Sequence, residues 1–205
     1  MPSNNLLAEV VPQFFPAHWL DDAPDLVFSS FPSRIRIGYV VRREGGYSYV
    51  MRPAVEEVGV SLEALHNSAL DNLRAMPIGG LQVGQTPGGP EAFLTGVEDN
   101  FHAARILLPN VQAAIVQQLG NEFFAAIPCR DWFVCWSKNQ SKEWQDRNVA
   151  KALEDFTNDE YNLTPDILLR STVGFSLHLA QEIDAEPSYV PSALNKKNDS
   201  VPGID

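Results

Sequence analysis

The segment from Glu122 to Trp136 constrains the fold of this chain more than any other stretch. Two apolar, aromatic-rich runs flank a short corner, Pro128-Cys129-Arg130-Asp131. Apolar runs on either side of a turn-forming corner are typical of a buried β-hairpin. A guanidinium and a carboxylate at the bend of such a hairpin need a structural or a functional role, and the sequence is compatible with both.

The composition favours a single globular domain with tails. The chain has 205 residues, of which 44% are hydrophobic, and its 15 basic and 26 acidic side chains give a formal net charge of -11. Because an acidic surface repels phosphate backbones and anionic lipids, we expect neither nucleic acid nor a membrane as a partner. No apolar run approaches the roughly 20 residues of a membrane span, and the N-terminus lacks a secretory signal. The cytoplasm is therefore the expected compartment.

Alternating side chains predict a second hairpin, nearer the N-terminus. Apolar residues recur at every second position over Ile35–Val41 and again over Tyr47–Met51, on either side of Glu44-Gly45-Gly46. A period of two is the pattern of a half-buried strand, and glycines tolerate the positive φ of a tight turn. A further alternating stretch in the second half of Thr164–Leu179 predicts a closing strand.

Three segments have the apolar spacing of amphipathic helices, with steps of three and four residues. They are residues 61–76, 110–119 and 142–158. Ser61 is suited to cap the first helix, and Gly120 is suited to end the second.

The glycine-rich segment from Pro77 to Pro90 is interpreted as a mobile loop, with a short strand at Leu81–Gln85. No Gly-Lys-Ser/Thr motif follows the glycines. The sequence therefore predicts no nucleotide-binding loop here.

Together these elements predict an α+β fold, with a mixed or antiparallel sheet and helices packed mainly on one face. The expected organisation is an N-terminal arm at residues 1–25, a single α+β domain at residues 26–184, and a poorly ordered tail at residues 185–205. The tail carries prolines and scattered polar residues, and it has little apolar surface to bury.

The order of the motifs resembles a known family. Gly59–Leu65 leads into Ala69-Leu70-Asp71-Asn72-Leu73, and Asn100–Leu108 is followed by the corner at Ala126–Trp132. Over roughly residues 35–180 the chain is similar to the YtpQ-like family of bacterial proteins, a domain of unknown function. The resemblance implies a bacterial cytosolic protein, and it carries over no activity and no catalytic residue.

The two cysteines are expected to be free, buried thiols. If the chain between them were extended, Cys129 and Cys135 would lie about 20 Å apart, outside the ~4.4–6.8 Å Cα separation of a disulfide. No Gly-x-Ser-x-Gly motif is present, and neither cysteine is paired with a nearby histidine. Nucleophilic hydrolysis therefore finds no support in the motifs.

Arg130 and Asp131 are the first candidate site. The guanidinium could clamp an anionic ligand while the carboxylate acts as a base. In the structural alternative, Asp131 accepts hydrogen bonds from the amides of its own turn, and Arg130 pairs elsewhere.

A second cluster places Glu98, Asp99, Asn100 and His102 close together, with Arg105 one turn later. Such a group could hold a metal or move a proton, but a metal site needs three or four convergent ligands. We therefore predict no metal and no cofactor. An acidic, Asn-capped start of a helix explains the same residues equally well.

The leading hypothesis is a non-enzymatic binding or protein-interaction module with an unknown protein or small-molecule partner. Its contact surface is expected at or near the aromatic hairpin and the Arg130–Asp131 corner, with Asn72 and Asn100 as further binding candidates. Asn72 has the structural alternative of reaching a neighbouring backbone and fixing the packing of its helix. The alternative function is a small hydrolase-like enzyme that uses Asp131, Arg130 and His102 in a polar cleft.

Overall fold

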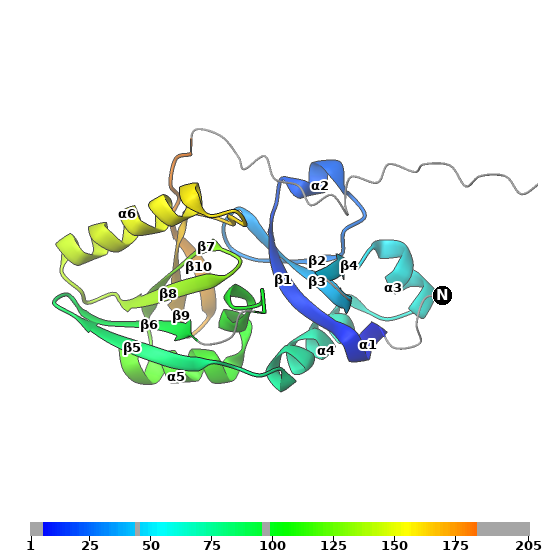
Figure 1. Cartoon of the computed structure of the whole chain (residues 1–205), viewed down its shortest axis with the longest axis horizontal. Coiled ribbons are helices and arrows are strands. Elements are labelled where there is room, and N and C mark those ends of the chain that lie inside the picture. Colours follow the sequence, from blue (N-terminus) through cyan, green and yellow to red (C-terminus); the bar gives the residue numbers. More distant parts are fainter. Residues whose placement is uncertain (1–5, 44–45, 96–98, 184–205) are drawn as a thin grey trace, which may run out of the picture.

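The computed structural model describes residues 6–43, 46–95 and 99–183, which form two antiparallel β-sheets and six α-helices (Figure 1). This is an α+β fold with antiparallel sheets, as predicted from the two hairpins. The expected tail at 185–205 lies outside the described residues. No described helix combines the length and the apolar character that crossing a membrane requires.

The first sheet has four strands arranged around β3 (Ile35–Arg43). β1 (Val10–Pro16) pairs with one edge of β3, while β2 (Phe28–Ser30) and β4 (Gly46–Tyr49) pair with the other. β3 and β4 form the predicted N-terminal hairpin, of whose turn Glu44 and Gly45 lie outside the described residues. β1 falls within the segment expected to be an arm, and its seven residues pair with β3 along their whole length.

β3 is buried on both faces, whereas its alternation predicted a half-buried strand. Tyr39 and Val40 point to opposite faces of the sheet, and both are fully buried. The close approach of β1 requires a glycine at position 38, because a Cβ there would lie only 2.8 Å from Cδ1 of Phe15. A small apolar cluster covers the second face; it contains Phe15, Trp19, Ala23 and Leu26.

Four helices surround this sheet: α1 (Leu6–Glu9), α2 (Trp19–Asp22), α3 (Arg52–Val58) and α4 (Leu62–Ala75). α4 is the helix predicted over residues 61–76. Ser61 caps it as expected, because the amide of Ala64 donates a hydrogen bond to Ser61 Oγ at 3.1 Å. The apolar face of α4 packs on β1.

The second sheet has six strands in the order β10-β9-β7-β8-β6-β5, and all neighbouring strands are antiparallel. The strands are β5 (Gly80–Thr86), β6 (Gly89–Thr95), β7 (Phe123–Cys129), β8 (Trp132–Ser137), β9 (Ile167–Ser171) and β10 (Gly174–Leu179). β7 and β8 confirm the hairpin predicted at Glu122–Trp136. β10 is the predicted closing strand, and it lies at one end of the sheet.

The short strand predicted at Leu81–Gln85 lies within β5. The prediction of a mobile loop around it is wrong, because Gly80–Thr95 forms the β5–β6 hairpin. The turn is held by Thr86 Oγ1, which donates to the carbonyl of Gly89 at 2.8 Å and accepts from the amide of Gly88 at 3.2 Å. β6 also pairs with β8, with Ala92 opposite Cys135. Pairing with a buried neighbouring strand stabilises the hairpin, despite glycines that disfavour an isolated strand.

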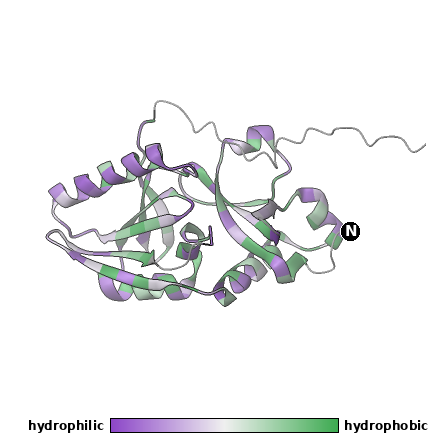
Figure 2. Cartoon of the chain, viewed as in Figure 1, coloured by the Kyte–Doolittle hydropathy of each residue, from purple (hydrophilic) through white to green (hydrophobic). Residues whose placement is uncertain are grey.

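Helices cover both faces of the six-stranded sheet, which differs from the expectation of helices mainly on one face. α5 (Pro109–Leu119) and the 3₁₀ helix η1 (Ala103–Leu107) lie on one face, and α6 (Lys142–Asn158) lies on the other (Figure 1). The reason is that side chains on both faces of β7 are apolar, so each face needs a cover. α6 has alternating hydrophilic and hydrophobic bands, whereas β7 and β8 are predominantly apolar (Figure 2).

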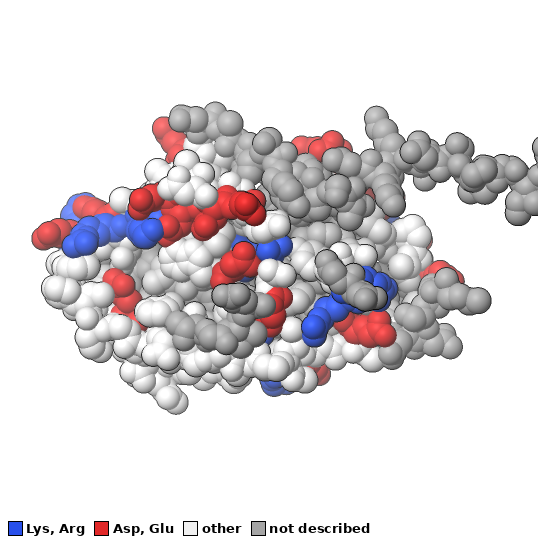
Figure 3. Space-filling model, viewed as in Figure 1, with Lys and Arg blue, Asp and Glu red and all other residues white. Residues whose placement is uncertain are grey.

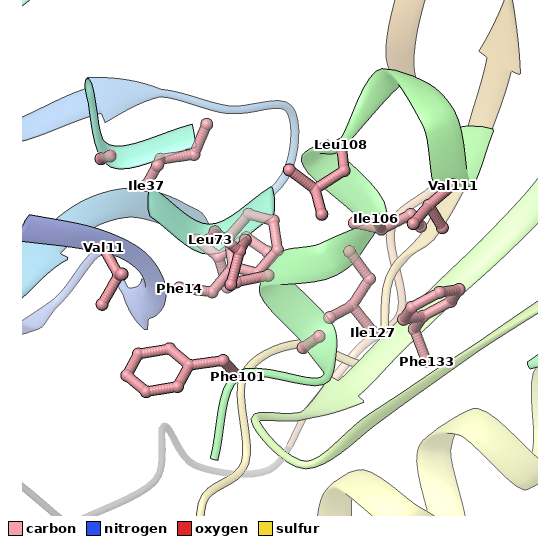
Figure 4. Packing of buried hydrophobic residues seen from close by; sticks show 14 of the residues in the cluster. Val11, Phe14, Ile37, Leu73, Phe101, Ile106, Leu108, Val111, Ile127 and Phe133 are labelled. Carbon is pink, nitrogen blue, oxygen red and sulfur yellow. The ribbon is translucent and has the colours of Figure 1, made fainter. Parts of the chain in front are cut away.

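The two sheets share one apolar core. The largest buried cluster includes Phe14 of β1 and Leu73 of α4 together with Ile106 of η1 and Phe133 of β8. In Figure 4, Phe14 lies beside Leu73, and Ile106 and Phe133 lie on the other side of the view. A chain of aromatic contacts follows the same route. It runs from Phe14 to Phe31 at 4.9 Å between ring centroids, to Phe175 at 5.6 Å, and to Phe123 at 6.4 Å.

A buried ion pair also joins the two sheets. Asp166, whose side chain is 2% exposed, accepts hydrogen bonds from Arg34 Nη2 at 3.0 Å and Nε at 3.2 Å. Ser33 Oγ and the amide of Gln181 donate to the same carboxylate at 2.6 and 3.0 Å. Burial acts to raise the pKa of Asp166, but these hydrogen bonds outweigh it and hold the pKa below its ordinary value.

We predict that Asp166→Asn lowers the free energy of unfolding by about 3–5 kcal/mol at pH 7, because Arg34 loses its buried partner. The folded-state pKa is lowered, so the carboxylate stabilises the fold above the unfolded-state value of about 3.9. That contribution is lost as the pH falls through the folded-state pKa. Urea unfolding should therefore show a difference between wild type and variant that narrows in acid. The matched control is Asp25→Asn, an exposed carboxylate 3.9 Å from Arg52; an equal loss in both variants would contradict the prediction.

Candidate functional site

The Arg130–Asp131 corner is the turn between β7 and β8, and the arms of this hairpin are buried. Phe123, Phe133 and Trp136 are at most 1% exposed. The expectation that the aromatic hairpin forms a contact surface is therefore wrong for these side chains, because α5, η1 and α6 cover them. The corner itself reaches the surface.

The guanidinium of Arg130 has four neighbours, of which three come from distant parts of the chain and the fourth is the adjacent Asp131. It lies over the ring of Tyr161, with Cζ 3.5 Å from the ring centroid. Nη1 donates to the hydroxyl of Tyr47 at 3.2 Å, and Nη2 donates to Asn100 Oδ1 at 3.0 Å. Nε donates to Asp131 Oδ1 at 3.1 Å. The side chain is only 11% exposed, so an incoming anion would have to displace these partners.

The backbone at the corner is bound as firmly as the side chain. The amide of Arg130 donates to the carbonyl of Tyr161 at 2.9 Å, and its carbonyl accepts from the amide of Ala103 at 3.1 Å. This arrangement fixes the start of η1 and the segment after α6 against the hairpin. It supports the interpretation of Arg130 as a structural clamp.

Asp131 differs from its neighbour because its side chain is 48% exposed. Within the described part of the chain its carboxylate accepts hydrogen bonds from Arg130 rather than from amides of the turn. The structural alternative expected from the sequence, a carboxylate saturated by turn amides, is therefore not observed. An exposed ion pair of this kind contributes little to stability.

Of the second cluster, Glu98 lies outside the described residues. Asp99 forms a two-pronged ion pair with Arg105, in which Nη1 donates to Oδ1 at 2.8 Å and Nη2 donates to Oδ2 at 2.5 Å. Arg105 is fully buried, and it also donates to the carbonyl of Pro77 at 2.9 Å. Burial acts to raise the pKa of Asp99, but the hydrogen bonds from Arg105 and the Phe101 amide outweigh it, so the pKa lies below its ordinary value. A carboxylate held in this way is a weak base.

The expected Asn-capped helix start is also wrong. Asn100 has a left-handed backbone with φ of 65°, and η1 begins only at Ala103. Its Oδ1 accepts from Arg130, as described above, while its carbonyl accepts from Nε2 of the buried Gln13 at 2.6 Å. Asn100 thus connects β1 to the corner. His102, at the N-cap position, makes no side-chain cap hydrogen bond.

The structure brings some of the predicted site residues together and separates others. Arg130 contacts both Asp131 and Asn100, and half-buried His102 follows Asn100 closely in the sequence. Asn72 lies elsewhere, on α4. Its side-chain amide donates to the carbonyls of Leu7 and Val10, both at 2.8 Å, which is the packing role given as its structural alternative.

The two cysteines are poorly suited to act as nucleophiles. Both cysteines are free and buried, as expected. Burial raises the pKa of the Cys129 thiol to about 12 and that of Cys135 well above its ordinary value, so neither forms a thiolate readily. In residues 6–43, 46–95 and 99–183 no group of three histidine, cysteine or acidic side chains is placed to hold a metal ion.

One exposed surface was not assigned a role from the sequence. β10 is the outer strand of its sheet and, among the described strands, pairs only with β9. Val173 is 96% exposed, Leu177 46% and Leu179 41%. The sequence feature that could have indicated this surface is the absence of any charged residue between Ser171 and Gln181, in a chain with 20% charged residues.

Comparison of the chain with protein-family models, with curated protein sequences and with solved structures finds no match. Membership of the YtpQ-like family stays a prediction that depends on the motifs.

We predict that Arg130→Ala lowers the free energy of unfolding by about 3–5 kcal/mol, because four partners lose a largely buried cation. Asp131→Asn should cost less than about 1 kcal/mol, since that carboxylate is half exposed. Urea unfolding of both variants at neutral pH measures the difference. Arg52→Ala, which removes an exposed arginine, serves as the control. Equal losses for Arg130→Ala and Asp131→Asn would show that the corner is not a clamp.

Proposed function

We propose that this chain is a non-enzymatic binding module of the cytoplasm, which takes up an extended segment of a partner protein along the open edge of β10. The observation that carries the proposal is an outer strand that lacks charged residues and exposes apolar side chains. A segment that pairs with such an edge gains main-chain hydrogen bonds, and its alternate side chains contact the neighbouring surface.

An open edge of this composition is unusual on a chain with a net charge of -11. Exposed edge strands are commonly protected by charged side chains, prolines or bulges, because an unprotected edge pairs with other chains. β10 has one such device, a register shift between Leu177 and Leu179. The shift leaves Gly174–Leu177 as the regular part of the edge, and this part has no charge to block pairing.

The partner segment is expected to be uncharged and apolar at its centre, with basic residues on its flanks. The centre faces the uncharged edge of β10. The flanks meet a chain with a net charge of -11, and exposed Glu182 lies shortly after the end of the strand at Leu179. Opposite charges steer the encounter and raise the association rate. A second copy of the chain fits less well, because its own charge is also -11.

The hydrolase-like alternative receives less support. Arg130 is engaged by four neighbours, and Asp131 is paired with Arg130. The resemblance to the YtpQ-like family is compatible with a binding module, since it carries over no catalytic residue. Within the proposal, Arg130 and Asn100 maintain the fold and do not contact the partner.

We predict that a labelled peptide of alternating valine and threonine, flanked by lysines, binds the protein saturably. Leu177→Lys should weaken this binding about tenfold or more, because a cation beside the edge repels the lysine flanks and blocks strand addition. Fluorescence anisotropy measures the affinity.

Two controls make this experiment decisive. The same peptide with N-methylated alternate amides should not bind, since it cannot donate the main-chain hydrogen bonds. Leu62→Lys changes a leucine that is equally exposed, at 44%, but lies on α4, and it should leave binding unchanged. Equal binding of both peptides, or an equal effect of the two leucine variants, would refute the edge of β10 as the site. Sedimentation that shows a dimer dissociated by Leu177→Lys would also count against a partner segment, because a second copy would then occupy the edge.

A further inference from the structure

A groove of about 620 Å³ lies where α1, the end of β3 and the end of α4 meet. It belongs to the first sheet, and it has no residue in common with β10. Its volume is in the range of small-molecule sites, which is roughly 300–1,000 Å³. The lining residues that bear on its chemistry are Glu9, Val11, Arg42, Arg43, Met76 and Pro77. In Figure 3, basic and acidic side chains lie next to each other in the area of α1 and the adjoining strands.

Arg42 is the notable member of this lining. Within the described residues its side chain makes no hydrogen bond, ion pair or ring contact. Each of the other arginines has at least one such contact. The exposed Arg42 guanidinium therefore retains all its donors for a ligand.

The other charges of the groove largely balance one another. Arg43 Nη1 lies 3.4 Å from Glu9 Oε2. The C-terminal end of α4, at Ala75, contributes a partial negative charge of about half an electron. The positive charge of Arg42 exceeds this partial charge, so the groove remains favourable for one anionic group.

The remaining wall is apolar and firmly placed. Met76, Pro77 and the exposed Ala75 offer it apolar surface. Asn72 ties α4 to β1 and α1 through its two hydrogen bonds to backbone carbonyls, so the groove has a fixed shape. A ligand that fills it needs one anionic end for Arg42 and an apolar body for this wall.

We propose that this groove binds a small amphipathic carboxylate, with Arg42 donating to the carboxylate group and the apolar body packing against Met76 and Pro77. The planar guanidinium matches a carboxylate through two parallel hydrogen bonds, which favours it over a simple point charge. Burial of the apolar body adds to the affinity in proportion to the area removed from water. This inference is independent of the segment proposed to bind at β10, and either one can fail without the other.

Titration of the full chain with octanoate, followed by ¹H–¹⁵N NMR, tests the proposal. Saturable shifts are expected at residues of the groove, and Arg42→Gln should weaken the affinity about tenfold or more. Octanol, which lacks the carboxylate, and propionate, which lacks the apolar body, should both bind more weakly than octanoate. Glu9→Gln should strengthen octanoate binding, since it releases Arg43 from its partner.

The control is Arg52→Gln, which removes an exposed arginine outside the groove and should leave octanoate binding unchanged. Thermal melting of each variant establishes that the fold is intact. The proposal is overturned if octanoate shifts no residue of the groove, or if Arg42→Gln and Arg52→Gln have equal effects. Competition by inorganic phosphate at the same concentration as octanoate would also overturn it, because the apolar wall would then contribute nothing.

Discussion

The stacking and hydrogen bonding of the Arg130 side chain hold together segments from both halves of this molecule. Its partners belong to the first sheet at Tyr47, to the segment before η1 at Asn100, and to the segment after α6 at Tyr161. Asn100 in turn binds Gln13 of β1. A single cation therefore connects segments that are far apart in the sequence, and the low exposure of its side chain makes these contacts difficult to replace with water.

The spacing of apolar residues predicted those elements whose form depends mainly on neighbouring residues in the sequence. Residues 61–76 and 142–158 have the spacing of amphipathic helices, and α4 and α6 form there. The β5–β6 hairpin was missed because its glycines obscure the alternation, and because pairing with β8 supplies much of its stability. The clamp at Arg130 required Tyr47 and Tyr161, and no spacing rule connects residues so distant. The left-handed backbone conformation of Asn100 was not predicted from the sequence either. This residue is held by contacts with Gln13 and Arg130, which are distant in the sequence.

The predicted site and the surfaces proposed to bind differ in one physical respect. The charged groups singled out from the sequence are largely engaged: Arg130 by its four neighbours, and Arg105 by Asp99 and a carbonyl. The edge of β10 and the groove at Arg42 instead leave hydrogen-bonding groups without a described partner. Charge alone was therefore a poor guide to binding, because a buried charge must already be paired for the chain to fold.

The outer strands at the two ends of the six-stranded sheet are both free of charged residues, since β5 is as uncharged as β10. If β10 of one molecule met β5 of the next, the contact would join unlike surfaces, and each addition would leave the same two ends exposed. Such head-to-tail association does not close and grows into a fibre. Repulsion between chains of net charge -11 opposes this growth, and it weakens as salt is added. A ligand strand seated on β10 would act as a terminator, because it removes one of the two growing ends.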